Sequence, residues 1–246
     1  MSSATIQQVS VDRGPWFQTA SGRVFYPHAP ALAEIFLEDI ARSLSMQCRF
    51  NGHCEAFYSV AEHSRWVSLR VAPVEELDIL AKATSDVGKQ AYQDLVHTGL
   101  FGLMHDAAEA YVGDMVSPVK HVPAMSPFRL VEDKIQRTIA ERFDFWDYFC
   151  GSKLKAPSEA VKLADRRLLL TEKRDLRKPG KHDSPAWEVG ERTGLQPYDD
   201  LKLRGESPSE AEELFLARFQ ELWRRKTGVA WDDDEISPPE GAGVLP

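Results

Sequence analysis

The stretch that decides the fold is Leu103-Met104-His105-Asp106-Ala107-Ala108-Glu109-Ala110-Tyr111. It closes a longer segment, residues 97–111, that is rich in Leu, Phe, Met and Ala, as expected for a buried helix. Within this stretch, His105, Asp106 and Glu109 are the histidine and the two acids. Since they are separated by no more than four residues, all three can approach one side of a helix end. The sequence therefore predicts a buried helix that ends in a cluster of polar groups.

Helical periodicity extends outward from this stretch in both directions. Apolar residues recur at helical spacing in segments that predict helices over residues 30–44, 58–71, 127–143, 158–176 and 207–226. Residues 75–93 are charged and contain Gly88, which indicates a helical excursion outside the core. No alternating pattern typical of a strand stands out. The expected fold class is all-α.

Length and composition predict one helical domain with additions. The chain has 246 residues, of which 43% are hydrophobic, so a real core can form. We expect an N-terminal extension over residues 1–28 and a single domain over 29–226, with insertions at about 74–96 and 177–205. The last segment, 227–246, is acidic and Pro-rich, and its composition predicts a disordered, flexible tail.

The charge balance excludes several partners. Lys and Arg total 30 against 38 Asp and Glu, a net charge of −8, and residues 206–246 hold ten acids but four bases. Because binding to a DNA or RNA lattice needs a basic patch, no such partner is expected. No apolar run approaches the roughly 18 residues of a membrane span. Residues 1–8 lack the basic region and following apolar run of a signal peptide. A cytoplasmic protein without a membrane partner is therefore expected. Cys48, Cys54 and Cys150 form neither a disulfide framework nor a zinc ribbon, and reduced thiols are expected.

Three helical segments offer candidate metal ligands, namely His63, the pair His105-Asp106, and Asp165. The gaps of 42 and 59 residues are too long for a local finger but suit ligands delivered by separate helices of a bundle. Two imidazoles and two carboxylates suit a divalent ion with open positions for water and substrate better than they suit structural zinc. The alternative is that these are structural or exposed side chains, since a chain with 7 His contains some His-Asp pair by chance.

A resemblance to a known family favours the metal site. The blocks that carry it are Ser59-Val60-Ala61-Glu62-His63-Ser64, residues 103–111, Gly113-Asp114, Ser117-Pro118-Val119-Lys120 and Val161-Lys162-Leu163-Ala164-Asp165. In order and spacing they resemble the HD-domain phosphohydrolases, especially the phage and prophage HD hydrolases and their bacterial 5′-deoxynucleotidase relatives. The likeness runs from about residue 19 to 177. It implies an HD-domain helical bundle.

The resemblance also implies a ligand set and catalytic residues. One divalent ion (Mn, Co, Fe, Mg or Zn) would be held by His63, His105, Asp106 and Asp165, and it would polarise a phosphoryl oxygen and orient water for attack on phosphorus. Glu109 resembles the glutamate that positions or deprotonates that water. Asp114 resembles an aspartate near the sugar and the reacting phosphate. From the residues alone, Glu109 could equally be an acid on an exposed helix face, and Asp114 a turn residue.

Substrate-binding candidates follow from the same comparison. Arg49-Phe50 lies 14 residues before His63, where the relatives have an Arg followed by an aromatic residue, usually Trp. An Arg there would pair with phosphate, and the ring would lie beside the sugar or base. Further candidates are Lys120, Arg23 and His53, for which a solvated cation or a structural loop histidine is the alternative. Glu172 shares a helix face with Asp165 and is a candidate partner for Arg49.

The expected function is a metal-dependent nucleotide phosphohydrolase, a hydrolase of phosphoric esters. The leading form is a 5′-nucleotidase that converts (deoxy)nucleoside monophosphates to nucleoside and phosphate. One alternative is a deoxynucleoside triphosphate triphosphohydrolase of the dATP type, a phage nucleotide-pool enzyme. Another is a non-catalytic, metal-dependent nucleotide sensor. The expected partners are a nucleotide substrate and further copies of the chain, in the host cytoplasm if the protein is phage-encoded.

Overall fold

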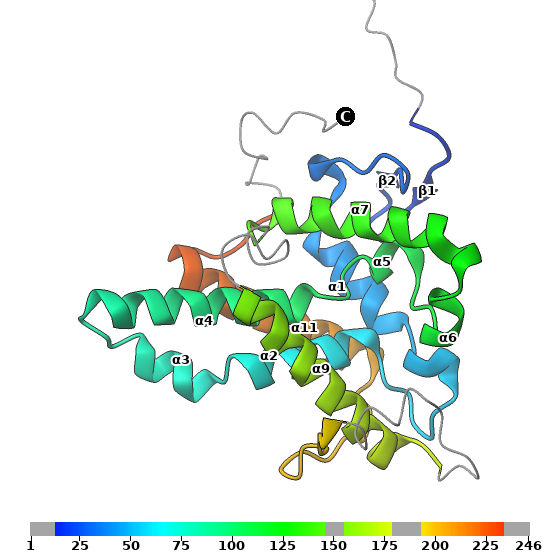
Figure 1. The fold of residues 1–246 in the computed structure, drawn as a ribbon. Coiled ribbons are helices and arrows are strands. Elements are labelled where there is room, and N and C mark those ends of the chain that lie inside the picture. Colours follow the sequence, from blue (N-terminus) through cyan, green and yellow to red (C-terminus); the bar gives the residue numbers. More distant parts are fainter. Residues whose placement is uncertain (1–12, 146–154, 179–192, 234–246) are drawn as a thin grey trace, which may run out of the picture.

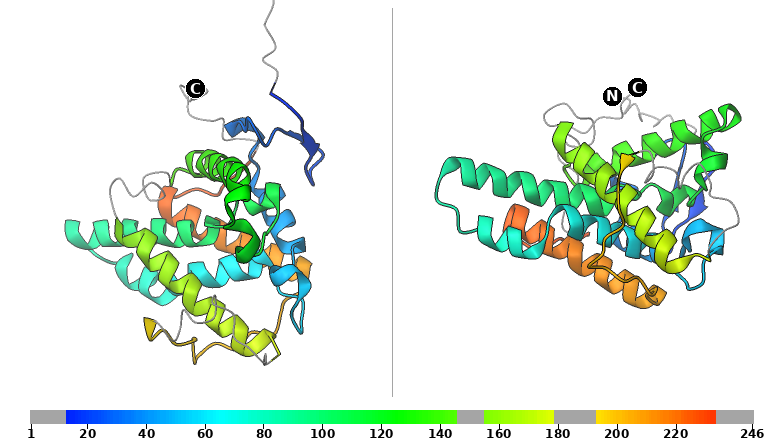
Figure 2. Two further views of the ribbon diagram at one scale, coloured as in Figure 1. Left: turned by 45° about the vertical axis from the view of Figure 1, so that its right-hand side comes forward. Right: turned by 60° about the horizontal axis from the view of Figure 1, so that its bottom comes forward.

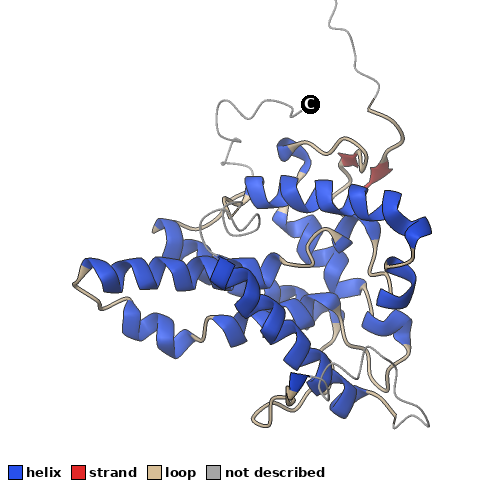
Figure 3. Cartoon of the chain, in the orientation of Figure 1, coloured by secondary structure: helices blue, strands red, loops and turns tan. Residues whose placement is uncertain are grey.

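The structure, a computed structural model, describes residues 13–145, 155–178 and 193–233. Helices make up most of these residues, so the prediction of an all-α protein is confirmed (Figure 3). Within the described part of the chain, strands are confined to a small antiparallel hairpin of β1 (Phe17–Gln18) and β2 (Val24–Phe25). Strands of two residues are too short to produce a detectable alternation in sequence.

The helices follow one another along the chain, with the longest connection between α9 and α11 (Figure 1). They are α1 (Leu37–Met46), α2 (Val60–Val71), α3 (Val74–Leu80), α4 (Asp86–Met104), α5 (Glu109–Val112), α6 (Ser117–Lys120), α7 (Ser126–Arg142), α9 (Lys155–Leu176) and α11 (Pro208–Thr227). Short 3-10 turns cover Leu32–Glu34, Arg49–Gly52 and Pro123–Met125. The first helix of the bundle therefore begins at residue 37 rather than at residue 30.

The segment expected as a helical excursion divides into two elements. Residues 74–80 form α3, and α4 then begins at Asp86 and runs without interruption into the buried segment. Ser85 is the N-cap of α4, and its hydroxyl accepts a hydrogen bond from the Gly88 N–H at 3.2 Å. Gly88 thus lies in the first turn of a capped helix and does not interrupt it.

The core forms where α2, α4, α9 and α11 pack together (Figure 2). Glycines on α4 allow α2 to approach closely: a Cβ at Gly99 would lie 2.8 Å from the Ala72 Cβ, and one at Gly102 would lie 3.2 Å from the Ser68 Cα. Fully buried apolar side chains fill the layers between helices, among them Ile40, Val67, Leu100, Leu103, Leu168, Phe215 and Phe219. This close packing brings the start of α2 and the end of α4 together.

Parts of the segments expected as extension and tail pack onto the bundle. Phe25 of the N-terminal hairpin is fully buried and stacks on Tyr111, with ring centroids 4.0 Å apart. Near the other end, Trp231 is 5% exposed and packs against Phe143 and Trp223. Residues beyond 233 lie outside the described part of the chain.

The end of α9 is joined to the segment that precedes α11. Arg174 donates hydrogen bonds to the carbonyl groups of Tyr198 and Leu201, and the Leu203 N–H donates to the Asp175 carboxylate at 2.9 Å. These contacts attach residues 198–203, which belong to the long segment expected as an insertion at 177–205, to the end of α9. Among the helices described, none has the length and apolar character needed to cross a membrane.

Candidate metal centre

Three of the predicted ligands converge from three helices. His63 lies in the first turn of α2, His105 follows the last residue of α4, and Asp165 lies in the middle of α9. One ligand atom from each lies within 4.8 Å of the others. His63 Nε2 is 3.2 Å from Asp165 Oδ1, and the two imidazole centroids are 5.4 Å apart. This His-His-Asp group could hold a metal ion.

The fourth predicted ligand, Asp106, lies beside this group. Its Oδ2 is 3.2 Å from His105 Nε2 and 3.8 Å from His63 Nε2. The same oxygen is 3.7 Å from Arg49 Nη1. The two histidines and two aspartates chosen from the sequence thus meet at one place in the bundle.

The free nitrogen of each imidazole faces the cluster. His63 Nδ1 donates to Glu172 Oε1 at 2.6 Å, and His105 Nδ1 donates to the Gly102 carbonyl oxygen at 2.8 Å. Both Nε2 atoms are buried, and neither has a hydrogen-bond partner among the described residues. A histidine ligand usually donates its other nitrogen to an oxygen and keeps one nitrogen for the metal. The donor set therefore fits a divalent ion.

His105 and Asp106 each shift the pKa of the other. Burial alone would lower the pKa of His105, but the adjacent Asp106 carboxylate outweighs burial and raises the pKa to about 9. Burial alone would raise the pKa of Asp106, yet the His105 imidazolium holds it well below its usual range. The raised pKa of His105 means that a proton competes with a cation for this imidazole. A metal that binds here must displace protons, which makes its affinity dependent on pH.

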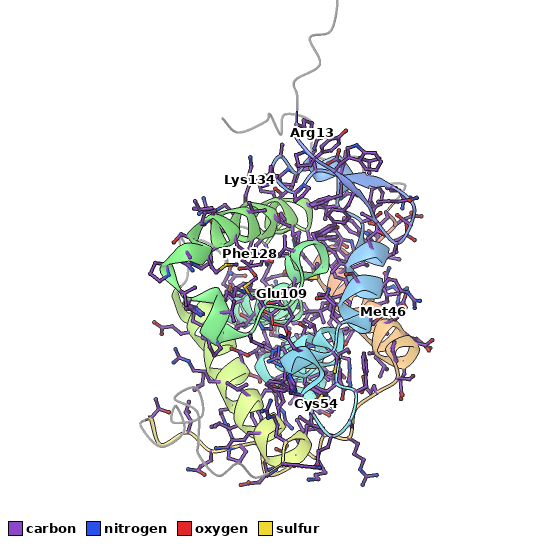
Figure 4. All side chains as sticks on the ribbon, turned by 90° about the vertical axis from the view of Figure 1, so that its right-hand side faces the viewer. Arg13, Met46, Cys54, Glu109, Phe128 and Lys134 are labelled. Atoms are coloured by element: carbon purple, nitrogen blue, oxygen red, sulfur yellow. The ribbon has the colours of Figure 1, made fainter. Side chains whose placement is uncertain are left out.

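Glu109 is the first residue of α5 and lies at the centre of this face of the molecule, between α7 and α1 (Figure 4). It is 6% exposed, and its Oε2 has no hydrogen-bond partner in the described part of the chain. Burial and the nearby carboxylates of Asp106 and Asp114 raise the pKa of Glu109 to about 9. Lys120 Nζ lies 3.5 Å from Glu109 Oε1. A carboxyl in these surroundings can hold a proton near neutral pH and release it when positive charge is added.

A cavity of about 220 Å³ opens beside the metal ligands. His105 and Asp106 line one side of it, and Glu109 and Lys120 also face it. Four residues of α7 also line the cavity, namely Arg129, Glu132, Asp133 and Gln136. The cavity thus places two candidate metal ligands, the buried carboxyl group of Glu109 and two cations around one volume.

Arg49 lies at the inner edge of the site. It is held by two carboxylates, with Nη2 3.3 Å from Glu172 Oε2 and Nη1 near Asp106. The pairing of Arg49 with Glu172 that the helix face suggested is therefore present. Phe50 follows with a positive φ of 58°, a strained conformation for an aromatic residue, and the Arg177 guanidinium lies over its ring.

The remaining candidates lie in different surroundings. Asp114 is part of the electrostatic environment of the cluster, and its N–H donates to Gln47 Oε1 at 2.9 Å. His53 is exposed at the end of the 3-10 turn that begins at Arg49. Arg23 belongs to the N-terminal hairpin, where it pairs with Glu38 and lies over the Phe36 ring. Neither Arg23 nor His53 is among the residues that line the cavity.

Sequence reasoning missed the α7 contribution to the site. Gln136 is 5% exposed and lies between the buried Ile135 and Ile139. A long amide on the apolar face of a predicted helix was the available signal, because a buried amide must find hydrogen-bond partners. Arg129 and Glu132 carried no such signal, since isolated charges on an amphipathic helix are usually solvated.

Comparisons with known proteins find relatives over nearly the whole chain. No protein-family model matches the sequence. The uncharacterized protein YfdR of Escherichia coli is 32% identical over 207 residues, which span 84% of this chain and 95% of that protein. An uncharacterized protein of Rhodobacter capsulatus is 28% identical over 216 residues, which span 87% of this chain and 98% of that protein. The similarity is therefore not confined to the residues of the site.

Proposed function

Since the chain belongs to the family of the Escherichia coli protein YfdR, we propose that this family member is a metal-dependent phosphohydrolase of the HD-domain type. One observation carries the proposal. The buried Nε2 atoms of His63 and His105 lack hydrogen-bond partners among the described residues and lie beside the carboxylates of Asp106 and Asp165. Such a set of donors around one point suits a divalent cation next to a substrate cavity.

His63, His105, Asp106 and Asp165 would hold the cation, which when bound supplies a Lewis acid for a phosphoryl oxygen. The chain itself fixes the orientation of these groups. Glu172 and the Gly102 carbonyl group hold the two imidazoles by their Nδ1 atoms. Both imidazoles are thereby turned so that Nε2 lies beside the Asp106 and Asp165 carboxylates, and little reorganisation is needed on binding.

Glu109 is the residue suited to move a proton. Its carboxyl faces the cavity, and its raised pKa reflects burial beside other carboxylates. Added positive charge at the cluster would oppose the repulsion from Asp106 and favour ionisation of Glu109. The carboxylate at Oε2 could then accept a proton from water that attacks phosphorus, and return it to the leaving oxygen.

Arg49 and Lys120 are the cations that the family resemblance indicates for a phosphate group. Both already face carboxylates, Arg49 those of Glu172 and Asp106, and Lys120 those of Glu109 and Glu132. The cavity itself is lined by the acids Asp106, Glu109, Glu132 and Asp133 against the cations Lys120 and Arg129, so it holds little excess positive charge, which favours one phosphate group over three. Phe50 would lie beside the sugar or base. We therefore propose nucleoside monophosphates, including deoxynucleotides, as substrates, with nucleoside and phosphate as products.

Product analysis tests this function. The purified protein should release orthophosphate from a panel of nucleoside monophosphates when Mn²⁺, Co²⁺ or Mg²⁺ is supplied. Both His105→Ala and Asp106→Ala should abolish this release and reduce the bound metal. Release of tripolyphosphate from deoxynucleoside triphosphates would replace the proposed substrate class with triphosphates. Tight nucleotide binding without turnover under every metal would instead mean a sensor, and full activity in both variants would refute the assigned centre.

A further inference from the structure

The helix that carries His105 and Asp106 is broken at those residues. α4 ends at Met104 and α5 begins at Glu109. In a continuous α-helix, the N–H of residue 108 would donate to the carbonyl group of residue 104. Here the Ala108 N–H donates instead to Gln136 Oε1 at 2.9 Å, and Gln136 Nε2 donates to the Met104 carbonyl oxygen at 2.7 Å. The side-chain amide of Gln136 therefore stands where one backbone hydrogen bond of the helix would be.

The backbone around the insertion is wound more tightly than an α-helix. The N–H groups of Ala107, Glu109, Ala110 and Tyr111 each donate to the carbonyl group three residues earlier, at 3.0–3.2 Å. A side chain inserted into the hydrogen-bond ladder is a recognised cause of helix kinks, and short 3-10 stretches within a helix often mark functional positions. The break thus has a specific physical cause in α7.

The break has a consequence for the ligands. On a regular α-helix, adjacent residues point about 100° apart and do not face one another. His105 and Asp106 are adjacent, yet His105 Nε2 lies 3.2 Å from Asp106 Oδ2. Both side chains also reach His63, whose Nε2 is 3.8 Å from Asp106 Oδ2. These two consecutive residues meet at one centre at the point where Gln136 replaces the backbone hydrogen bond between Ala108 and Met104.

A second glutamine supports the next turn from the other side. Gln47, the residue after α1, donates from Nε2 to the Glu109 carbonyl oxygen at 3.0 Å and accepts the Asp114 N–H at 2.9 Å. α5 therefore lies between α1 and α7 and is held by an amide from each (Figure 1). The support by Gln47 fixes α5, while the insertion of Gln136 fixes the residues before it.

We propose that Gln136 is a positioning residue that holds the α4–α5 junction open so that His105 and Asp106 converge on one cation. This assignment rests on the metal-binding part of the proposed function. It does not depend on which phosphate ester is the substrate. Gln136 lines the cavity, but it acts on His105 and Asp106 through the backbone of residues 104–108.

The test compares Gln136→Met with Ile135→Val in the full-length protein. Methionine has a similar length but forms neither hydrogen bond, and the Ile135 variant disturbs the adjacent buried position of α7 without touching the junction. We expect the Met variant to fold and to bind Mn²⁺ at least tenfold more weakly than the wild type in calorimetric titration. The Ile135 variant should lower the melting temperature and leave the Mn²⁺ affinity unchanged.

A crystal structure of the Met variant provides a readout that a purely stabilising role would not change. The Ala108 N–H should then donate directly to the Met104 carbonyl oxygen, with His105 and Asp106 turned apart. A junction that stays open, or an unchanged Mn²⁺ affinity, would overturn the proposal. If the wild type binds no Mn²⁺, the proposed function fails, and the crystal structure still decides what Gln136 does. Should the Met variant not fold, Gln136→Asn, one methylene too short to span both backbone groups, takes its place with the same expectations.

Discussion

His63 donates from Nδ1 to Glu172 Oε1 at 2.6 Å, and both side chains are fully buried. Glu172 lies two turns after Asp165 on α9, so one face of this helix presents both a candidate ligand and the partner of another ligand. The second oxygen of Glu172 lies 3.3 Å from Arg49 Nη2. This one carboxylate therefore orients the imidazole of a candidate ligand and neutralises Arg49, the cation that we propose for phosphate.

Replacing Glu172 should weaken metal binding. Without an acceptor at Nδ1, the imidazole of His63 is free to rotate or change tautomer, and loss of such a partner typically lowers metal affinity by about 10–100-fold. We expect this loss in Glu172→Ala, measured by calorimetric titration with Mn²⁺. Glu172→Gln retains an acceptor oxygen and should lose less. Equal Mn²⁺ affinities for the Ala variant and the wild type would contradict the role assigned to Glu172.

Asp233 connects the far end of the described chain to the beginning of α1. Its carboxylate accepts the Leu37 N–H at 3.0–3.1 Å, and α1 has no side-chain cap of its own. Removal of an N-terminal cap costs about 1 kcal/mol. Asp233→Ala should therefore lower the melting temperature by about 2–4 °C in a calorimetric scan. Glu213→Ala, which removes an exposed acid from α11, is the control, and equal melting temperatures for the two variants would exclude the cap.

Glu62 should make stability fall as the pH rises. Glu62 is 2% exposed, and burial raises its pKa from 4.5 to about 7. The hydrogen bond that its carboxylate accepts from the Glu206 N–H at 2.8 Å lowers the pKa, but burial has the larger effect. Between these two values the folded protein keeps a proton that the unfolded chain has released. The favourable contribution is therefore complete below pH 4.5 and is lost as the pH passes about 7.

Glu62→Gln removes this titration and keeps an acceptor for the Glu206 N–H. The difference in melting temperature, variant minus wild type, should increase by several degrees between pH 5 and pH 8. The same measurement on Glu76→Gln, an exposed acid of α3, should give a difference that is constant with pH. A constant difference for the Glu62 variant as well would show that this carboxyl does not titrate in the range given.

Local signals explain which helices could be predicted from the sequence. Residues 207–226 were expected as a helix, and α11 spans Pro208–Thr227. Its start is marked by the Ser207 hydroxyl, which accepts the Glu210 N–H, and its end by Gly228 in the left-handed conformation. Both signals lie within the segment itself. The expected helix over 97–111 is interrupted at residues 105–108, because the break after Met104 depends on another helix.

The candidate site likewise has a part that could be predicted from the sequence and a part that could not. Residue types and family resemblance selected His63, His105, Asp106 and Asp165, and the fold brings them together. The arrangement that makes this possible depends on Gln136, whose two backbone partners lie 28 and 32 residues earlier in the chain. No periodicity within a segment reports such a contact. Supporting residues of this kind become visible only when the packing of the helices is known.

Glu109 should separate catalysis from metal binding. It faces the cavity without belonging to the His-His-Asp group, so Glu109→Gln removes the proton-carrying carboxyl and leaves the ligand atoms in place. Since a general base typically contributes roughly 10²–10⁴-fold to a rate, kcat for phosphate release should fall by that factor, while the Mn²⁺ affinity stays within about threefold of the wild type. Glu76→Gln, which makes the same replacement at an exposed site on α3, should retain the wild-type kcat. A Glu109 variant with full kcat would exclude this residue as the base, and a parallel loss of bound Mn²⁺ would instead make Glu109 part of the metal site.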